Sequence, residues 1–398
     1  MTSICVHSKM KINYYKNIPL LYIYSILIKR VSMPIIIIYF LLNNLNFTQI
    51  GILGATIAII HVSLEVHGGV FADLKGNKLS LMIHSVFAAL CMFFYLIGDS
   101  FWYFFAASIC YGASGAFISG SRNSLMFETL QKLKRTKEFK KFNGRMLLVS
   151  HLVNAVVLLL IPFVFNYNPK LPFVIGIGFF VGSFVVASLF IEPKKRVKKS
   201  SSKDFHHNLF KALRIVANER EIFSAILLTT VIAAFIYVGS EYIQPLLSIA
   251  GLPVIYFGVV YALMRVLMGV GAALTHKLER WFSPDSIILL VVFLVAASFI
   301  GYLLGFGVII PICVLLINFA FGMNRVVLED KVNQNVKSNR TTILSIMSLT
   351  QTLFKAALIF VSGMLADYFG VQGLFFFVLI GFLVFAFAAV RYSRKVYI

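Results

Sequence analysis

Long apolar runs alternate with short polar links along the whole chain. Each run holds about twenty mainly apolar residues, the length that an α-helix needs to cross a hydrocarbon core about 30 Å thick. The pattern therefore predicts an all-α membrane protein of about twelve membrane-spanning helices. The predicted spans are residues 18–42, 48–71, 79–98, 101–126, 146–165, 171–191, 222–247, 254–275, 286–305, 308–327, 342–366 and 373–390.

Composition agrees with this pattern. Charged residues make up only 13% of the 398 residues, and hydrophobic residues make up 60%. A soluble domain has about 25% charged residues and too little interior to bury so much apolar surface. The four cysteines are widely spaced and form no metal-binding or disulfide pattern, so no metal and no cofactor is expected.

The net charge of +21 would suit a nucleic-acid partner, but the positions of the charges indicate a lipid bilayer instead. Of the 36 Lys and Arg residues, 29 lie in the tails and in alternate links, and six lie inside the spans. Only Lys170 lies in the other set of links. The positive-inside rule then predicts that both termini are cytoplasmic. We expect an integral membrane protein of a prokaryotic plasma membrane, with no nucleic-acid partner.

The chain has two similar halves. Gly120–Glu128 and Gly322–Asp330 both run nine residues from a glycine to an acidic residue, at the ends of the fourth and tenth spans. This predicts two six-helix bundles related by pseudo-twofold symmetry, with the substrate path at their interface. The expected domains are an N-terminal bundle (1–191), a basic cytoplasmic linker (192–220) and a C-terminal bundle (221–398).

The link after the second span reads GGVFADLKGNKLSL. We expect Gly69 and Gly76 to permit a tight turn, and Asp73 and Lys78 to form a charged clamp. The stretch resembles the loop 2–3 signature of the major facilitator superfamily, roughly G-x-L-A-D-R-x-G-R-K. This resemblance implies the two-bundle fold of that family and a gating role for the motif.

In that family the aspartate meets the start of the eleventh helix, which here would lie near Asn339–Thr342. Leu74 and Asn77 replace arginines of the usual pattern. The run HVSLEVHGGVFAD, with Glu65, is similar to facilitators of the drug-exporter-like type. However, the fourth span lacks their usual arginine, and the fifth span lacks the G-P-x-x-G-G run of drug/proton antiporters.

Ionisable residues inside spans are costly in a bilayer and therefore indicate functional sites. Lys29, Arg30, Arg265 and Lys355 lie near mid-span, and Glu241 lies within the seventh span. The resemblance places their spans around one central cavity. The four cations outnumber Glu241 and Glu65, which favours an anionic or zwitterionic substrate. Alternatively, Glu241 neutralises Lys29 or Arg30, and Glu65 pairs locally.

Proton coupling requires a group that changes its charge with the access state. Glu65 and Glu241 are candidates, because burial and neighbouring cations move the pKa of a carboxyl group in opposite directions. His61 is a third candidate. A lone histidine on an apolar helix also suits simple packing.

These features predict a secondary transporter that moves a small organic solute by alternating access, with proton-coupled export of an anionic or zwitterionic compound. A multidrug/proton antiporter for cationic or neutral amphiphiles is the alternative. A channel or a transport-inactive receptor is the alternative of another class. No catalytic motif is present, so an enzyme is not expected. The transporter is expected to work as a monomer.

Overall fold

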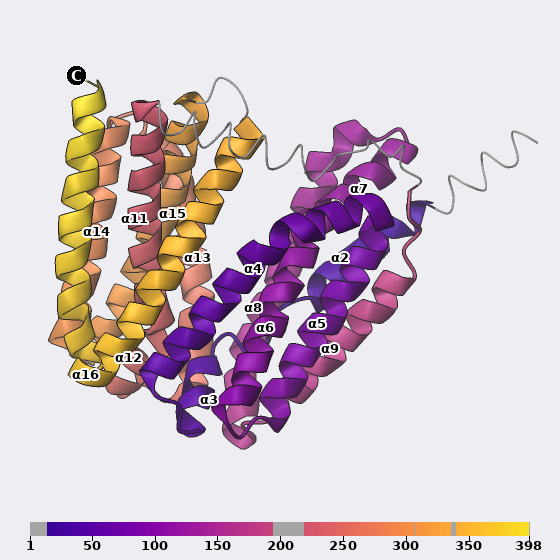
Figure 1. Cartoon of the computed structure of the whole chain (residues 1–398), viewed down its shortest axis with the longest axis horizontal. Helices are drawn as coiled ribbons and strands as arrows, with labels where there is room; N and C mark the ends of the chain where they lie inside the picture. Colours follow the sequence, from indigo (N-terminus) through magenta and orange to yellow (C-terminus); the bar gives the residue numbers. More distant parts are fainter. Residues whose placement is uncertain (1–13, 194–218, 306, 336–339, 398) are drawn as a thin grey trace, which may run out of the picture. The chain divides into compact units, whose positions relative to one another are not determined.

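The computed structural model describes residues 14–193, 219–305, 307–335 and 340–397, and all regular structure in these residues is helical (Figure 1). The first helices are α2 (Asn17–Leu27), α3 (Ile36–Leu42), α4 (Phe47–Lys75), α5 (Asn77–Ile97), α6 (Phe101–Ile118), α7 (Ser121–Lys132), α8 (Phe139–Tyr167) and α9 (Leu171–Ser188). They are followed by α11 (Arg220–Glu241), α12 (Ile243–Ile249), α13 (Phe257–Leu278), α14 (Pro284–Leu304), α15 (Ile309–Asn335) and α16 (Arg340–Tyr397).

The chain forms two compact units, which do not follow the order of the sequence. Counting described residues only, the first unit comprises those in Met1–Met33 and Thr56–Ser200, and the second those in Pro34–Ala55 and Ser201–Ile398. The segment Pro34–Ala55 therefore packs with the second unit. The predicted domain limits stay predictions, because most of the linker, residues 194–218, lies outside the described residues.

The first predicted span, residues 18–42, is two helices instead of one. Helix α2 ends at Leu27 and α3 begins at Ile36, so Lys29 and Arg30 lie in the irregular segment between them. Pro34 explains the break, because it lacks a backbone N–H and disfavours helical geometry in the residue before it.

Two other span boundaries differ from the predicted ones. Helix α6 ends at Ile118, and Gly120 has a φ angle of +79° before α7 begins, whereas α15 continues without a break past Gly322. The two similar stretches therefore have different backbones. Helix α16 contains the last two predicted spans and bends at Gly370, where φ is +73°.

The number of spans agrees with the sequence. Nine helical ranges within the described residues are long and apolar enough to cross a membrane. One of them, Ile346–Tyr392, contains the bend at Gly370 and is long enough for two spans. Two shorter apolar helices, Asn17–Leu27 and Ile309–Asn324, account for the remaining predicted spans. An all-α membrane protein of about twelve spans is confirmed.

Small residues allow close contact between α13 and α15, which lie side by side in the second unit (Figure 1). Gly271 of α13 lies against the carbonyl oxygen of Phe319, and Gly322 of α15 lies against the carbonyl oxygen of Met268. A Cβ atom at either glycine would collide with the facing backbone. Such small-residue contacts are typical of helices packed within membranes, where close approach gives dispersion energy.

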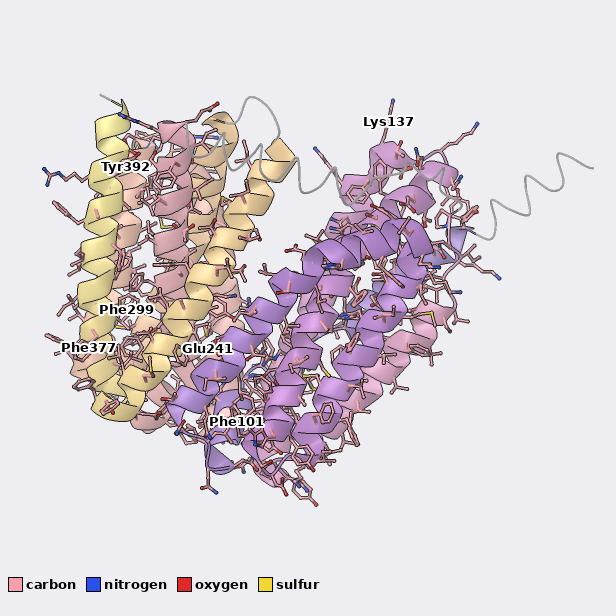
Figure 2. The ribbon with its side chains drawn as sticks, viewed as in Figure 1. Phe101, Lys137, Glu241, Phe299, Phe377 and Tyr392 are labelled. Carbon is pink, nitrogen blue, oxygen red and sulfur yellow. The ribbon has the colours of Figure 1, made fainter. Side chains whose placement is uncertain are left out.

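Aromatic side chains fill the interior of the second unit. Phe299 is fully buried inside this bundle, whereas Phe377 on α16 is 37% exposed on its outer side (Figure 2). The Phe299 ring stacks on Phe375 with centroids 5.9 Å apart and meets Phe382 edge-on at 5.7 Å. These contacts join α14 to the last part of α16.

A buried asparagine ties three parts of the first unit together. The amide nitrogen of Asn17 donates to the Thr129 hydroxyl (3.0 Å) and to the Ile191 carbonyl (2.8 Å). Its oxygen accepts the Ile191 N–H at 2.9 Å. Asn17 is fully buried, so the amide satisfies polar groups that have no access to water.

We expect Asn17→Ala to lower the free energy of unfolding by about 2–3 kcal/mol, because it leaves buried donors and acceptors without partners. Thermal unfolding of the purified protein in detergent measures this loss. Asn123→Ala, at an exposed position on α7, is the matched control and should unfold as the parent does. Equal stability of all three proteins would contradict the prediction.

Candidate functional site

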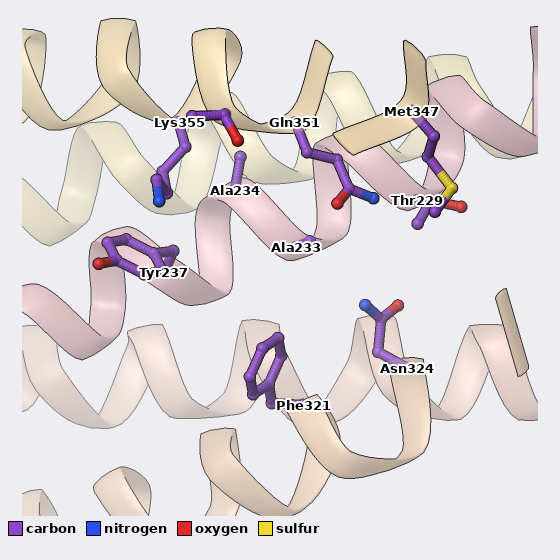
Figure 3. A pocket seen from close by; sticks show the side chains of 10 residues that line it. Thr229, Ala233, Ala234, Tyr237, Phe321, Asn324, Met347, Gln351 and Lys355 are labelled. Atoms are coloured by element: carbon purple, nitrogen blue, oxygen red, sulfur yellow. The ribbon is translucent and has the colours of Figure 1, made fainter. Parts of the chain in front are cut away.

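The second unit contains a cavity of about 300 Å³ between α11, α15 and α16. Figure 3 shows side chains from all three helices pointing into it. This volume is at the lower end of the range for small-ligand pockets, roughly 300–1,000 Å³. The lining residues are Thr229, Ala233, Ala234, Tyr237, Phe321, Asn324, Met347, Gln351, Thr352 and Lys355.

Lys355 is the one charged residue among those that line this cavity. Its Nζ atom lies 4.1 Å from the centroid of the Tyr237 ring, and the side chain is half-buried. An ammonium group over an aromatic face gains about 1–2 kcal/mol when water is largely excluded. The ring thus positions the cation without neutralising it, so Lys355 keeps its capacity to attract an anion.

Two side-chain amides and a hydroxyl accompany this cation. Asn324 is only 3% exposed, and its Oδ1 atom accepts no hydrogen bond from any described residue. Gln351 lies one helical turn before Lys355, and its amide lies across the cavity from Asn324 (Figure 3). Thr229 donates its hydroxyl proton to the Ala225 carbonyl at 2.6 Å, so its oxygen remains an acceptor. Together they offer hydrogen bonds to a polar ligand.

The first unit has its own cavity, of about 320 Å³, which is lined by Arg30, His61, His84 and Tyr111 among others. The guanidinium carbon of Arg30 lies 4.5 Å from the centroid of the Tyr111 ring. His61 faces Gly115, where an added Cβ atom would lie 2.6 Å from its Nδ1. The structure therefore brings the predicted residues Arg30 and His61 to one cavity.

His84 was not among the predicted site residues, although it lines the first cavity and is only 6% exposed. Its Nδ1 lies 2.9 Å from the carbonyl oxygen of Ser114. Because a carbonyl only accepts, Nδ1 carries the proton in the neutral ring and Nε2 is an acceptor. His84 therefore lies in the interior of its unit with its Nδ1 hydrogen-bonded.

The remaining predicted residues lie outside the linings of these two cavities. Glu241 is at the end of α11, near enough for its charge to act on Lys355. Arg265 is on α13, and Lys29 precedes Arg30 in the irregular segment after α2. Glu65 on α4 accepts a hydrogen bond from the Ser119 hydroxyl at 3.2 Å.

The turn between α4 and α5 is built on Gly76 and Glu192. Gly76 has a φ angle of +103°, which strongly favours glycine, and an added Cβ atom would lie 2.8 Å from the Glu192 carboxyl carbon. Glu192 accepts the backbone N–H groups of Asn77 (2.9 Å) and Lys78 (2.7 Å). The Asn77 amide donates to Glu128 at 3.1 Å. Glu192 therefore caps α5, at a helix end that attracts negative charge.

The other motif residues have different positions. Gly69 lies inside α4 with open space around it, so the prediction that it permits the turn is wrong; the chain turns at Gly76, beyond the end of the helix. Asp73 is exposed near the end of α4. The predicted partner segment of Asp73, near Asn339–Thr342, begins at residue 339, which lies outside the described residues. The gating role of Asp73 and Lys78 stays a prediction.

Removing the charge of Glu192 should loosen this turn. We expect Glu192→Gln to lower the free energy of unfolding by about 1–2 kcal/mol, because the amide keeps one acceptor oxygen and loses the charge. Thermal unfolding in detergent measures the change. Glu138→Gln is the control: it removes a partly exposed ion pair with Arg135, and ion pairs near the surface add little stability. An effect for Glu192 no larger than for Glu138 would refute the capping role.

Several cavity residues could not be predicted from the sequence, because no formal charge marks them within their spans. Asn324, Gln351 and His84 are polar residues within predicted spans, and such residues more often satisfy packing. One signal was available: Gln351 and Lys355 are four residues apart, so they share a helix face. Tyr237 also lines the cavity.

A bundle of apolar spans whose cavities hold polar and charged side chains is typical of membrane transport proteins. Residues 20–354 match the family model of the Major Facilitator Superfamily, and the chain belongs to this family. Secondary transport of a small molecule is the activity that this family membership supports.

Comparisons with individual proteins agree. An uncharacterized MFS-type transporter, YxaM of Bacillus subtilis (strain 168), is 26% identical over 251 residues, and the match spans 62% of each chain. The solved nucleoside transporter NupG has a similar fold (TM-score 0.78, 13% identity, 96% of this chain and 98% of that one). A bacterial homologue of the human lysosomal transporter Spinster also does (TM-score 0.69, 13% identity, 98% of both chains). At these identities the solved structures support the fold alone.

Proposed function

We propose that this transporter carries a small organic anion or zwitterion, and that it exports this compound by proton-coupled alternating access. In this proposal the transporter belongs to the drug-exporter-like branch and works as a monomer. It lies in a prokaryotic plasma membrane, with both termini in the cytoplasm. Its substrate residues are Lys29, Arg30, Glu241, Arg265 and Lys355, and its gate includes Gly76, Asp73 and Lys78.

The cavity of the second unit carries the proposal. Among its ten lining residues, Lys355 has the one formal charge, and none is acidic. A cation in low-dielectric surroundings attracts an anion strongly and repels a cation. The amides of Asn324 and Gln351 add hydrogen bonds that orient a polar group.

Glu241 extends this argument to zwitterions. Its carboxylate acts electrostatically on Lys355 and lies outside the lining of the cavity. A compound with a carboxylate at Lys355 and an ammonium group toward Glu241 would match both charges. A purely anionic compound would use Lys355 alone.

Proton coupling is proposed for His61, Glu65 and Glu241. His61 shares a cavity with Arg30, so protonation of the ring would place two cations close together and change ligand affinity. Glu65 lies on α4, and its Oε1 atom accepts a hydrogen bond from the Ser119 hydroxyl at 3.2 Å.

The test is a thermal-stabilisation screen of the purified protein with anions, zwitterions and cations of matched size. Ligands that bind the folded state raise its apparent stability. The best compounds are then measured for uptake into proteoliposomes with and without a pH gradient. Stabilisation by anions or zwitterions, with saturable and gradient-dependent flux, supports the proposal.

Other outcomes favour the alternatives. Tyr237, Phe321 and Met347 give the cavity aromatic and thioether surfaces, which also suit a cationic or neutral amphiphile of a multidrug/proton antiporter. Stabilisation by cations alone would support that function. Non-saturating flux would support a channel, and binding without flux would support a receptor.

A further inference from the structure

The segment Pro34–Ala55 lies in the first half of the sequence and packs with the second unit. It contains α3 and the first part of α4, while the rest of α4 belongs to the first unit. One helix thus has its two parts in different units. The contacts that hold its first part are therefore important for any motion of the transporter.

A single carboxylate holds the first turn of α4. Asp367 of α16 accepts the Phe47 N–H with Oδ1 at 2.8 Å and the Thr48 N–H with Oδ2 at 2.7 Å. First-turn N–H groups have no partner within their own helix, and the positive helix end attracts a negative charge. Both oxygens of Asp367 are used, so the side chain bridges two helices that are 320 residues apart in sequence.

The two helices touch backbone to backbone beside this carboxylate. An added Cβ atom at Gly363 of α16 would lie 2.5 Å from the Phe47 carbonyl oxygen, and one at Gly51 would lie 2.9 Å from the Ile359 carbonyl oxygen. The dispersion energy of such backbone contacts falls steeply with distance, so it is lost as soon as the helices separate. Asp367 supplies the directional part of the contact.

A second polar contact holds α3. The Oε1 atom of Gln244 accepts the Ile37 N–H (2.8 Å) and the Ile38 N–H (3.1 Å), and its Nε2 donates to the Tyr261 hydroxyl (3.1 Å). Gln244 is only 1% exposed, whereas Asp367 lies at the surface. Water can therefore compete for the bonds of Asp367 more readily than for those of Gln244, so the contact at Asp367 opens first.

We propose that Asp367 is a gating residue of the transport cycle. Its carboxylate holds the first part of α4 on α16, and release of the two N–H groups permits these helices to separate. Alternating access requires contacts at each face of the membrane to break and re-form in every cycle. The link before α4 has no Lys or Arg, and the charge distribution predicts it to lie outside. Asp367 then controls the outward-facing gate, whatever the substrate.

The experiment follows the opening of this contact by thiol labelling. Ser362 is 3% exposed, and its Oγ atom accepts the Tyr242 hydroxyl at 3.2 Å. The Tyr242 ring lies 5.9 Å from the Phe47 ring at the start of α4, so a cysteine at position 362 should react faster when this start moves away from α16. The full-length Ser362→Cys protein in liposomes is treated with a membrane-impermeant maleimide, and mass spectrometry measures the rate at that site. Adding Asp367→Asn should raise this rate on the order of ten-fold, because a charge-assisted contact is weakened.

Two controls separate gating from general loosening. Native Cys313, buried on α15 in the same unit, should keep its slow rate in every variant. Asp99→Asn removes an acidic residue from another short link and should leave labelling at position 362 unchanged. An unchanged rate at position 362 with Asp367→Asn, or a parallel rise at Cys313, overturns the proposal.

Hydrogen exchange of the unsubstituted protein provides a test that does not depend on folding of the variant. The Phe47 and Thr48 amides should exchange at least about ten-fold more slowly than the Trp102 amide, because the first turn of α6 has no side-chain cap. Equally fast exchange at both helix starts overturns the proposal. None of these measurements uses a substrate, so their failure leaves the proposed function untouched.

Discussion

Replacing Lys355 with glutamine is expected to weaken the binding of organic anions between about ten-fold and 100-fold, the loss that removal of one charged hydrogen-bond partner produces. The variant should fold normally, because Lys355 lines a cavity and its ammonium group contacts the Tyr237 ring without an ion pair to a lining residue. The same change should improve the binding of cations, because it removes a repulsive charge.

The measurement is the dissociation constant of the best anion from the stabilisation screen, by titration of the purified protein. Lys355→Arg keeps the charge and should lose much less affinity, although its planar group does not match the ammonium geometry. Lys170→Gln, in an exposed link, is the matched control for loss of a positive charge. If Lys355→Gln binds the anion as the parent does, the anion proposal fails.

Gly271→Ala is expected to have the largest effect on stability, with a loss of about 3 kcal/mol or more. The added Cβ atom would enter the space of the Phe319 carbonyl oxygen, which belongs to the backbone of α15 and is unable to rotate away. The two helices would have to separate along their contact and give up dispersion energy. We expect a lower unfolding temperature and a smaller yield of monodisperse protein.

Gly269→Ala is the control for this change. Gly269 is two residues away on the same helix, and an added Cβ atom would meet nothing within 4 Å. Alanine also favours helix over glycine by about 1 kcal/mol, so this variant should be as stable as the parent or slightly more stable. Similar losses for both variants would show that helix propensity or lipid contact, and not the contact between α13 and α15, determines the effect.

The sequence predicted the spans well because each one depends on its own residues. A run of about twenty apolar residues partitions into the bilayer whatever its neighbours are. The predicted span boundaries are wrong where a single residue changes the backbone within an apolar run. Pro34 divides the first span, and Gly120 separates α6 from α7. Both residues were visible in the sequence, but hydrophobicity alone does not measure their effect on the backbone.

The candidate site was predicted only in part. Charge inside an apolar run indicated Arg30 and Lys355, and both line cavities. The same argument also selected Arg265 and Glu241, which do not line either of the two cavities. Hydrophobicity gives the depth of a residue in the membrane, but the direction in which it points depends on how its helix is rotated against its neighbours.

By itself, the sequence determined the class of protein, the approximate spans and the family motif, because these follow from hydrophobicity and from local residue patterns. Only the tertiary structure decided that Glu192 caps α5, that Asn324 faces the cavity of Lys355, and that Asp367 holds the start of α4. Each of these contacts joins residues far apart in the chain. Their partners are set by helix packing, which depends on the whole set of small and large side chains at once.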